Sequence, residues 1–307
     1  MEQTVIRTKN SKTSSFYLDS FFNLMKPRVM SLVLFTCMVG LLIAPTKVNL
    51  LNSVLSLFAV AIGAGAAGAL NMWYESDLDA LMSRTCLRPI PTGKISKNQA
   101  LLFGVILSVI SVALLYFSSN LVSACLLLLT ICFYFFIYTV WLKRRTPQNI
   151  VIGGAAGALP PVIGWAIATG SLSIEPIILF LIIFLWTPSH FWALSLYKSG
   201  DYKKANIPMY PLIHGFKKTK KNIFVYSVLM IPTIAAPYFL NFASLVYFLP
   251  AISLTLYYVY LCNNLLKTKK NKETNFIARK IFIYSIFYLF SIFLLILIDT
   301  FLIKLYG

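Results

Sequence analysis

The amino-acid sequence predicts an all-α integral membrane protein with nine transmembrane helices. Of its 307 residues, 59% are hydrophobic and only 12% are charged, and the mean hydropathy is +0.78. The apolar runs are about twenty residues long, which is the length of a helix that spans a bilayer. A membrane β-barrel would instead show alternating segments of about ten residues. The composition therefore excludes a soluble globular protein and a β-barrel.

Nine apolar runs set the expected organisation of the chain. They cover residues 29–46, 53–74, 99–117, 121–142, 150–169, 173–196, 222–240, 243–265 and 281–302. We expect residues 1–28 to be a polar cytoplasmic tail, because they lack the apolar segment and cleavage site of a signal peptide. Residues 29–307 then form one domain, a bundle of nine helices around a central cavity.

The positive charges predict how this bundle is oriented. With nine spans, 25 of the 27 Lys and Arg residues fall on the side of the N-terminus, and only Lys47 and Lys304 fall on the other side. Cytoplasmic loops carry the excess of Lys and Arg. The N-terminus is therefore predicted to be cytoplasmic and the C-terminus outside. The net charge of +18 lies in short clusters between the spans, so it indicates no nucleic-acid partner.

An acidic cluster at the cytoplasmic end of the second span is the main candidate site. Asn71, Glu75 and Asp79 are spaced so that they share an arc of roughly 80° on one continuous helix, while Asp77 points elsewhere. Three of the nine acidic residues of the chain lie within positions 75–79. Carboxylates at a membrane edge are costly and usually functional, and hard oxygen ligands suit Mg²⁺. The alternative is a solvated helix end with a few charges.

Charged residues in two further places extend this candidate site. Arg84 and Arg88 follow the acidic cluster and can neutralise phosphate. Asp201 opens a second long cytoplasmic loop, and its carboxylate could complete a clamp in which each loop holds one metal ion against a diphosphate. Because Lys198 and other lysines surround Asp201, an ordinary loop ion pair is the alternative. Lys143 stands in a third basic cluster, for which a cytoplasmic anchoring role is also open.

His190 is the other polar residue of interest within the predicted spans. It is one of two histidines in the chain and lies in the sixth span, close to Trp186 and Trp192. Three roles stay open: an axial haem ligand, a proton-transfer group, or a hydrogen-bonded packing residue. If the helix continues to Asp201, His190 lies about three turns, or roughly 16 Å, deeper in the membrane.

These residue types fit the ionisation of an allylic diphosphate. When the diphosphate leaves, negative charge develops on it, and metal ions together with Arg and Lys stabilise that charge. The allylic cation that remains needs a dry cavity lined by aromatic faces. Aromatic residues make up 15% of the chain and can supply this lining. The site is expected at the cytoplasmic mouth of the bundle, with an apolar substrate tail between the helices.

The segment from Asn71 to Pro89 resembles the first signature of the intramembrane prenyltransferases, the UbiA superfamily. Its continuation, Met82-Ser83-Arg84-Thr85 followed by Arg88-Pro89, resembles the branch of that superfamily that farnesylates haem. Three further stretches resemble the same branch, at residues 138–144, 146–165 and 189–209. The resemblance covers residues 25–215, whereas the last three predicted helices match only in hydropathy.

The resemblance implies a reaction, its substrates and a location. A farnesyl group would pass from farnesyl diphosphate to the vinyl group of haem B, and water would add to give haem O for terminal oxidases. The cofactor would be Mg²⁺, with haem B as a substrate. The partners would be the lipid bilayer and a haem A synthase or oxidase assembly factors. The location would be the bacterial inner membrane, with the mitochondrial inner membrane as the alternative.

The resemblance also implies roles for individual residues. Asn71 and Asp79 match metal–diphosphate positions, and Asp201 matches the second acidic site. Glu75 stands where the family usually has an aspartate, and its extra methylene favours a water-mediated contact over direct ligation of the metal. The implied diphosphate contacts are Arg84, Arg88, Lys143 and Lys198. His190 would help to hold the haem acceptor.

Two other functions remain open on the sequence. A sibling transferase that acts on an aromatic or quinone precursor would share the first signature, but it would need no iron ligand such as His190. A proton-coupled transporter could also have nine spans and buried acids. Against the transporter, the acids lie at one membrane edge, and no pair of helices broken by Gly or Pro is evident.

Overall fold

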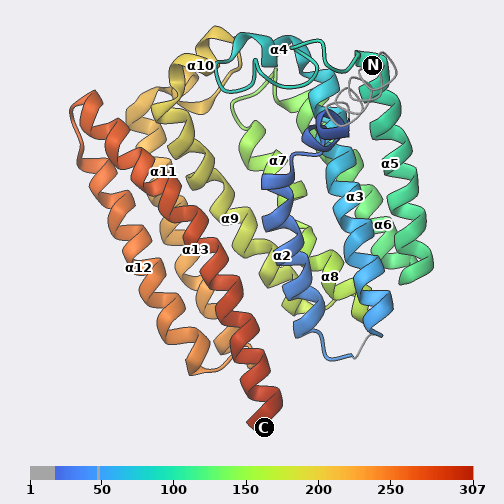
Figure 1. Cartoon of the computed structure of the whole chain (residues 1–307). Coiled ribbons are helices and arrows are strands. Elements are labelled where there is room, and N and C mark those ends of the chain that lie inside the picture. Colours follow the sequence, from blue (N-terminus) through green and yellow to red (C-terminus); the bar gives the residue numbers. More distant parts are fainter. Residues whose placement is uncertain (1–17, 47–48, 307) are drawn as a thin grey trace, which may run out of the picture.

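The computed structural model describes residues 18–46 and 49–306, and the regular secondary structure of this part of the chain is all helical, without strands. The long helices run side by side as a bundle, and two short helices lie at one end of it (Figure 1). The helices of the bundle are α2 (Pro27–Ile43), α3 (Leu50–Tyr74), α5 (Lys97–Ser118), α6 (Leu121–Cys132), the π-helix η1 (Phe133–Leu142), α7 (Asn149–Ala158), α8 (Pro160–Thr169), α9 (Ile174–Tyr197), α11 (Tyr210–Phe239), α12 (Leu245–Lys267) and α13 (Asn271–Tyr306). The short helices are α4 (Ser76–Leu81) and α10 (Ser199–Lys204).

The all-α membrane architecture is confirmed, but a count of nine spans is not. Eight segments among the described residues are long and apolar enough to cross a bilayer, and they correspond to the second to ninth predicted spans. The first predicted span, 29–46, corresponds to α2, whose 17 residues are about 25 Å long. Its apolar part, Met30–Ile43, falls short of the usual spanning length. Whether α2 crosses the membrane therefore stays a prediction.

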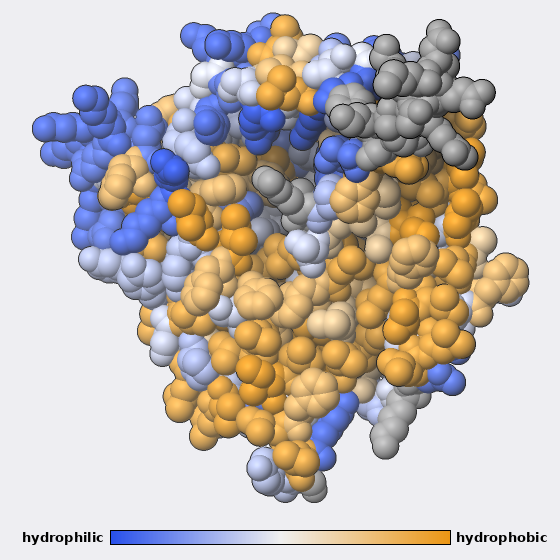
Figure 2. Space-filling view, in the orientation of Figure 1, coloured by the Kyte–Doolittle hydropathy of each residue, from blue (hydrophilic) through white to orange (hydrophobic). Residues whose placement is uncertain are grey.

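Two of the spans consist of two helices in series. In Leu121–Leu142 the α-helix α6 continues as the π-helix η1, and in Asn149–Thr169 helix α7 passes into α8. The second junction has a local cause, since Pro160 and Pro161 begin α8, where proline is tolerated because the first amides of a helix have no intrahelical acceptor. Figure 2 shows hydrophilic residues gathered mainly at one end, with apolar surface over most of the remaining face.

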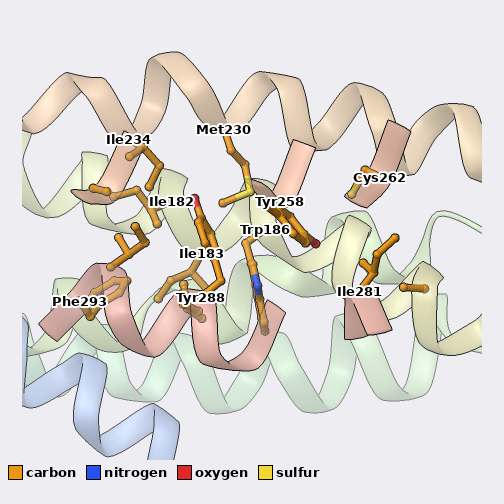
Figure 3. Packing of buried hydrophobic residues seen from close by; sticks show 14 of the residues in the cluster. Ile182, Ile183, Trp186, Met230, Ile234, Tyr258, Cys262, Ile281, Tyr288 and Phe293 are labelled. Carbon is orange, nitrogen blue, oxygen red and sulfur yellow. The ribbon is translucent and has the colours of Figure 1, made fainter. Parts of the chain in front are cut away.

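The largest buried cluster joins α9 to the last three helices. Figure 3 shows Trp186, Met230, Tyr258 and Tyr288 meeting between these helices. Their polar ends are paired: Trp186 Nε1 donates to the carbonyl oxygen of Ser285 at 2.9 Å, and the Tyr258 hydroxyl bonds to Ser189 at 2.8 Å. Aromatic side chains with satisfied polar ends pack well in a core. This cluster holds α9, and with it His190, in a fixed position against α13.

Close backbone contacts organise the other side of the bundle. At Gly164 in α8, a Cβ atom would lie 1.9 Å from the carbonyl oxygen of Cys37 in α2. Only glycine permits this approach, because the neighbour is backbone and cannot move aside. Residues 18–24, within the predicted tail, are also helical, and Leu24 is buried beside Ala69 and Met72 of α3. The chain around Lys26 is thereby held against the end of α3.

We predict that Gly164→Ala destabilises the protein although alanine favours helices. The added methyl group must separate α2 from α8, at a cost of about 1–3 kcal/mol. Gly157→Ala is the matched control, since Gly157 is also helical and a Cβ there would meet nothing within 4 Å. In thermal unfolding in one detergent, only Gly164→Ala should lower Tm. Equal Tm values for the two variants would contradict the close packing of α2 on α8.

Candidate active site

The three residues of the acidic face remain aligned although the helix that carries them is broken. The expectation of one continuous helix through Asp79 is wrong: α3 ends at Tyr74, and Glu75 separates it from α4. The amide of Glu75 still donates to the carbonyl of Asn71 at 3.0 Å, and the amide of Asp79 donates to that of Glu75 at 2.8 Å. The spacing of one turn therefore persists. Asn71, Glu75 and Asp79 are all buried, with exposures of 2%, 2% and 1%.

Each of these buried groups is paired with a cation from another part of the chain. Lys26 Nζ donates to Asn71 Oδ1 at 2.5 Å, and Lys143 Nζ lies 2.5 Å from Glu75 Oε2. Arg88 Nη1 donates to both carboxylate oxygens of Asp79 at 2.8 Å. Three basic groups thus face two carboxylates and one amide. The site has one more basic than acidic group, which suits an anionic ligand.

Asp77 does not belong to this cluster, as the helical spacing predicts. Its side chain is 54% exposed and forms an ion pair with Arg144 at 2.8 Å. The guanidinium of Arg144 also lies 5.1 Å from the ring centroid of Tyr74. Asp77 and Arg144 therefore make a surface contact beside the buried site.

A π-helix forms one wall of the site. Thr139 in η1 accepts a hydrogen bond from Asn71 Nδ2 at 3.0 Å and donates to the carbonyl of Tyr134 at 2.9 Å. The ring of Tyr138 lies 5.7 Å from Lys143 Nζ and 5.3 Å from the ring of Tyr134. Tyr138 also packs directly on α7, since a Cβ at Gly153 would meet its ring at 2.1 Å. π-Helices are frequent at functional sites because they re-aim side chains.

The second acidic loop meets the first loop at the same end of the bundle. Ser83 Oγ donates to Asp201, at 3.0 Å from each carboxylate oxygen. Arg84 Nη2 donates to the Tyr202 hydroxyl at 2.8 Å, and its guanidinium lies 5.0 Å from the centroid of that ring. Tyr202 packs in one buried cluster with Leu78 and, at its edge, Tyr138. The two loops therefore share one mouth.

The predicted site residues fall into three groups. The structure brings Asn71, Glu75, Asp79, Arg88 and Lys143 together in one buried cluster. Asp201 and Arg84 lie at the contact between the loops, where Arg84 is directed to Tyr202 rather than to Asp79. Lys198 is exposed at the break between α9 and α10 and takes part in none of the ion pairs among the described residues. The metal-binding and diphosphate-binding roles of these residues stay predictions.

Lys26 is the residue of this site that the sequence reasoning missed. It is the N-cap residue of α2 and has a left-handed conformation, with φ 55° and ψ 58°, which is uncommon for a residue other than glycine. Burial lowers the pKa of Lys26 to about 7; Arg88 and Lys143 lower it too, whereas Glu75 and Asp79 raise it. The only available signal was a lysine at the cytoplasmic edge of the first apolar run, which positive-inside counting treats as an anchor.

His190 lies between two aromatic rings in the core of α9 and α13. The rings of Trp186 and Phe282 stack on it at centroid distances of 4.3 and 4.6 Å, and only 7% of the residue is exposed. Its Nδ1 lies 2.6 Å from Ser285 Oγ. The next residue, Phe191, packs against the cluster that holds Tyr202. Phe191 therefore connects the histidine to the cluster around Tyr202, where the two acidic loops meet.

The predicted depth of His190 needs a correction. It assumed that the helix continues to Asp201, but α9 ends at Tyr197 and the backbone turns at Lys198, with φ −110° and ψ 19°. From His190 to the end of α9 is only about two turns, or roughly 10 Å. The histidine is therefore nearer to the mouth of the bundle than a single long helix would place it.

The oxygen donors of the buried cluster fit a hard divalent cation held jointly with a ligand. No group of three or more His, Cys, Asp or Glu side chains within residues 18–46 and 49–306 could hold a metal ion by itself. Glu75 Oε1 is nevertheless buried without a hydrogen-bond partner, beside the carboxylate of Asp79 and the amide of Asn71. Mg²⁺ commonly uses one or two carboxylates together with phosphate oxygens and water. The donor set matches that use.

A helical membrane bundle with buried acids and cations at one mouth defines an intramembrane enzyme for substrates with an anionic head and an apolar body. The profile of the UbiA prenyltransferase family matches residues 33–295 of the chain. The chain belongs to this family, and the membership expected from the signature after Asn71 is confirmed.

Curated relatives are similar over nearly the full length of the chain. The chain is 62% identical to a protoheme IX farnesyltransferase of Pelagibacter ubique, over 97% of this chain and 99% of the relative. It is 50% identical to protoheme IX farnesyltransferase 2 of Mesorhizobium japonicum, over 98% of this chain and 96% of the relative. A third relative of the same name, from Parvibaculum lavamentivorans, is 51% identical over 91% of this chain and 88% of the relative.

Solved structures share the fold at low sequence identity. A digeranylgeranylglyceryl phosphate synthase has a TM-score of 0.76 at 19% identity and covers 92% of this chain and 98% of its own. A UbiA homologue from Archaeoglobus fulgidus, bound to GPP and Mg²⁺, has a TM-score of 0.64 at 20% identity, over 90% of this chain and 99% of its own. The helical arrangement is thus that of the UbiA family.

We predict that Asp79→Asn abolishes prenyl transfer while folding and membrane insertion persist. Loss of one ligand charge from a metal–diphosphate site costs several kcal/mol in the transition state, or at least about a hundredfold in rate. Asp77→Asn is the matched control, because Asp77 is exposed and paired with Arg144. Near-normal turnover by a well-folded Asp79→Asn variant would show that this face is only a helix end.

Proposed function

We propose that this chain transfers the farnesyl group of farnesyl diphosphate to a vinyl group of haem B and adds water, forming haem O. The observation that supports the proposal is a cluster of buried oxygen ligands paired with basic groups, together with the buried imidazole of His190, which contacts Phe191 at the edge of the cluster that holds Tyr138 and Tyr202. The first part suits a diphosphate, and the second suits an iron porphyrin. Near full-length likeness to curated protoheme IX farnesyltransferases supports the same substrates.

The diphosphate would bind among the three partly buried basic side chains. Arg88 and Lys143 now pair with the carboxylates of Asp79 and Glu75, and Lys26 donates to the amide oxygen of Asn71. A bound diphosphate would draw these cations to itself and release oxygens of Glu75 and Asp79. Asn71 and Asp79, together with Asp201 of the second loop, would then hold Mg²⁺, and Glu75 would contact the metal through water. When bound, Mg²⁺ neutralises charge on the departing diphosphate.

The reaction breaks the bond between C1 of the farnesyl group and the diphosphate oxygen, and the diphosphate keeps the electron pair. The vinyl π electrons of haem B then form a bond to the farnesyl carbon, which leaves a cation on the carbon next to the porphyrin. Water adds to that carbon and loses a proton, which gives the hydroxyl group. Tyr134, Tyr138 and Phe191 would lie between the two substrates, where aromatic faces can stabilise cations.

The haem acceptor would be held by His190. The imidazole is buried between Trp186 and Phe282, which suits a flat apolar ligand at its free edge. Neutral imidazole is a common ligand of haem iron. A sibling transferase for a quinone precursor would not require this residue. A transporter is disfavoured because the chain belongs to a prenyltransferase family.

The proposed location is the bacterial inner membrane, with the N-terminus cytoplasmic and the C-terminus outside. The distribution of Lys and Arg supports this orientation. Helices α4 and α10 lie at one end of the bundle and the end of α13 lies at the other (Figure 1). Both acidic loops would then face the cytoplasm. A haem A synthase or oxidase assembly factors remain the proposed partners that receive the product.

The direct test is an assay for the product. Membranes that contain the protein are incubated with haem B, farnesyl diphosphate and Mg²⁺. The haem is then extracted, and its molecular mass is measured by mass spectrometry. We expect haem B to gain one farnesyl group and one hydroxyl group. Membranes with Asp79→Asn serve as the control. Farnesylation of a quinone precursor with unchanged haem would contradict the proposal.

A second test addresses the orientation in the membrane. Reporters fused after Lys97 and after Lys217 should report cytoplasm, because both positions lie in the lysine- and arginine-rich segments on the predicted cytoplasmic side. A reporter fused after Ser171 should report the outside. A reversal at any of the three positions would overturn the nine-span arrangement and the cytoplasmic mouth.

A further inference from the structure

We propose that Ser285 of α13 is a positioning residue that fixes the tautomer of His190, so that Nε2 faces the haem iron. This inference rests on the proposed haem-binding role of His190. Ser285 is 95 residues away in sequence. It lies in the part of the chain that carries no recognisable signature.

The hydrogen bonds around Ser285 determine which ring nitrogen carries the proton. A serine hydroxyl has one proton, and Ser285 Oγ donates it to the carbonyl of Phe282 at 2.7 Å. We assign the hydroxyl proton to this carbonyl, so that in the contact of 2.6 Å the same oxygen accepts from His190 Nδ1. Nδ1 then carries the proton of the neutral imidazole, and Nε2 keeps its lone pair. This is the tautomer in which Nε2 can bind iron.

The other edge of the ring is left available. Within the described part of the chain Nε2 makes no hydrogen bond, and it is not among the fully buried polar atoms that lack a partner. The faces of the ring are closed by Trp186 and Phe282, whose planes lie at 20° and 26° to the imidazole. The ring of Phe191 stands perpendicular to the imidazole at a centroid distance of 5.0 Å. We infer that a ligand approaches His190 along the remaining edge, which carries Nε2.

Ser285 is itself held in place from α9. Trp186 Nε1 donates to the carbonyl oxygen of Ser285 at 2.9 Å, and the ring of the same tryptophan stacks on His190. The backbone and the hydroxyl of Ser285 thus contact the two polar side chains of this pocket. Metal-binding histidines commonly donate their second N–H to such a fixed oxygen, which sets the orientation of the ring.

The test compares haem binding by Ser285→Ala with that of a matched control, Ser195→Ala. Ser195 is also buried in a helix and donates to a carbonyl of its own turn, that of Trp192, at 2.9 Å. The purified full-length protein is titrated with haem B, and the haem absorption spectrum is recorded. We expect Ser285→Ala to weaken binding about 10- to 100-fold and to shift the spectrum toward that of His190→Ala. Ser285→Thr, which keeps the hydroxyl, and Ser195→Ala should retain the wild-type spectrum.

The outcomes separate this inference from the proposed function. A spectral change in His190→Ala with a wild-type spectrum in Ser285→Ala would overturn the role of Ser285 alone. Equal shifts in Ser285→Ala and Ser195→Ala would also overturn it, as a general effect of losing a buried hydroxyl. An unchanged spectrum in His190→Ala would overturn both the haem-binding role of His190 and this inference. Farnesyl diphosphate binding should be the same in all four variants.

Discussion

The candidate site depends on one electrostatic constraint: charged groups inside an apolar helical bundle must neutralise one another. Glu75 and Asp79 are almost fully buried, and each is paired with a cation from another segment, Lys143 and Arg88. Such buried pairs add little stability, since well-packed apolar residues in their place are often as good or better. The proposed binding of a diphosphate gives these pairs a reason to be present. The pairing also forces η1 and the loop after α4 to converge on the end of α3.

Irregular backbone makes this convergence possible. The break at Glu75 turns α4 away from α3 while the spacing from Asn71 to Asp79 is kept. The π-helix turns Thr139 toward Asn71, and the left-handed Lys26 brings its ammonium to the same amide. The site is therefore built where the secondary structure departs from ideal geometry.

The two chemical parts of the site come from different parts of the bundle. The ion-paired cluster belongs to α3, η1 and the adjacent loops, whereas His190 belongs to the core shared by α9 and α13. Phe191 and Tyr138 pack against the same buried cluster and so join the two parts. This arrangement would keep a strongly charged leaving group apart from the haem acceptor and place a dry aromatic wall between them. Water would then be excluded from the allylic cation until the new carbon–carbon bond has formed.

The sequence by itself determined the helical membrane class, eight of the spans, the acidic face with Asp77 outside it, and the family signature. These features depend on hydropathy, charge and spacing within a few turns, which are local properties of the chain. Only the tertiary structure decided that Lys26 joins the cluster, that Arg84 turns to Tyr202, and that Ser285 meets His190. It also decided the break at Glu75 and the end of α9 at Tyr197. The contacts of Lys26, Arg84 and Ser285 join segments far apart in sequence. Their geometry is set by how the helices pack, which no local pattern encodes.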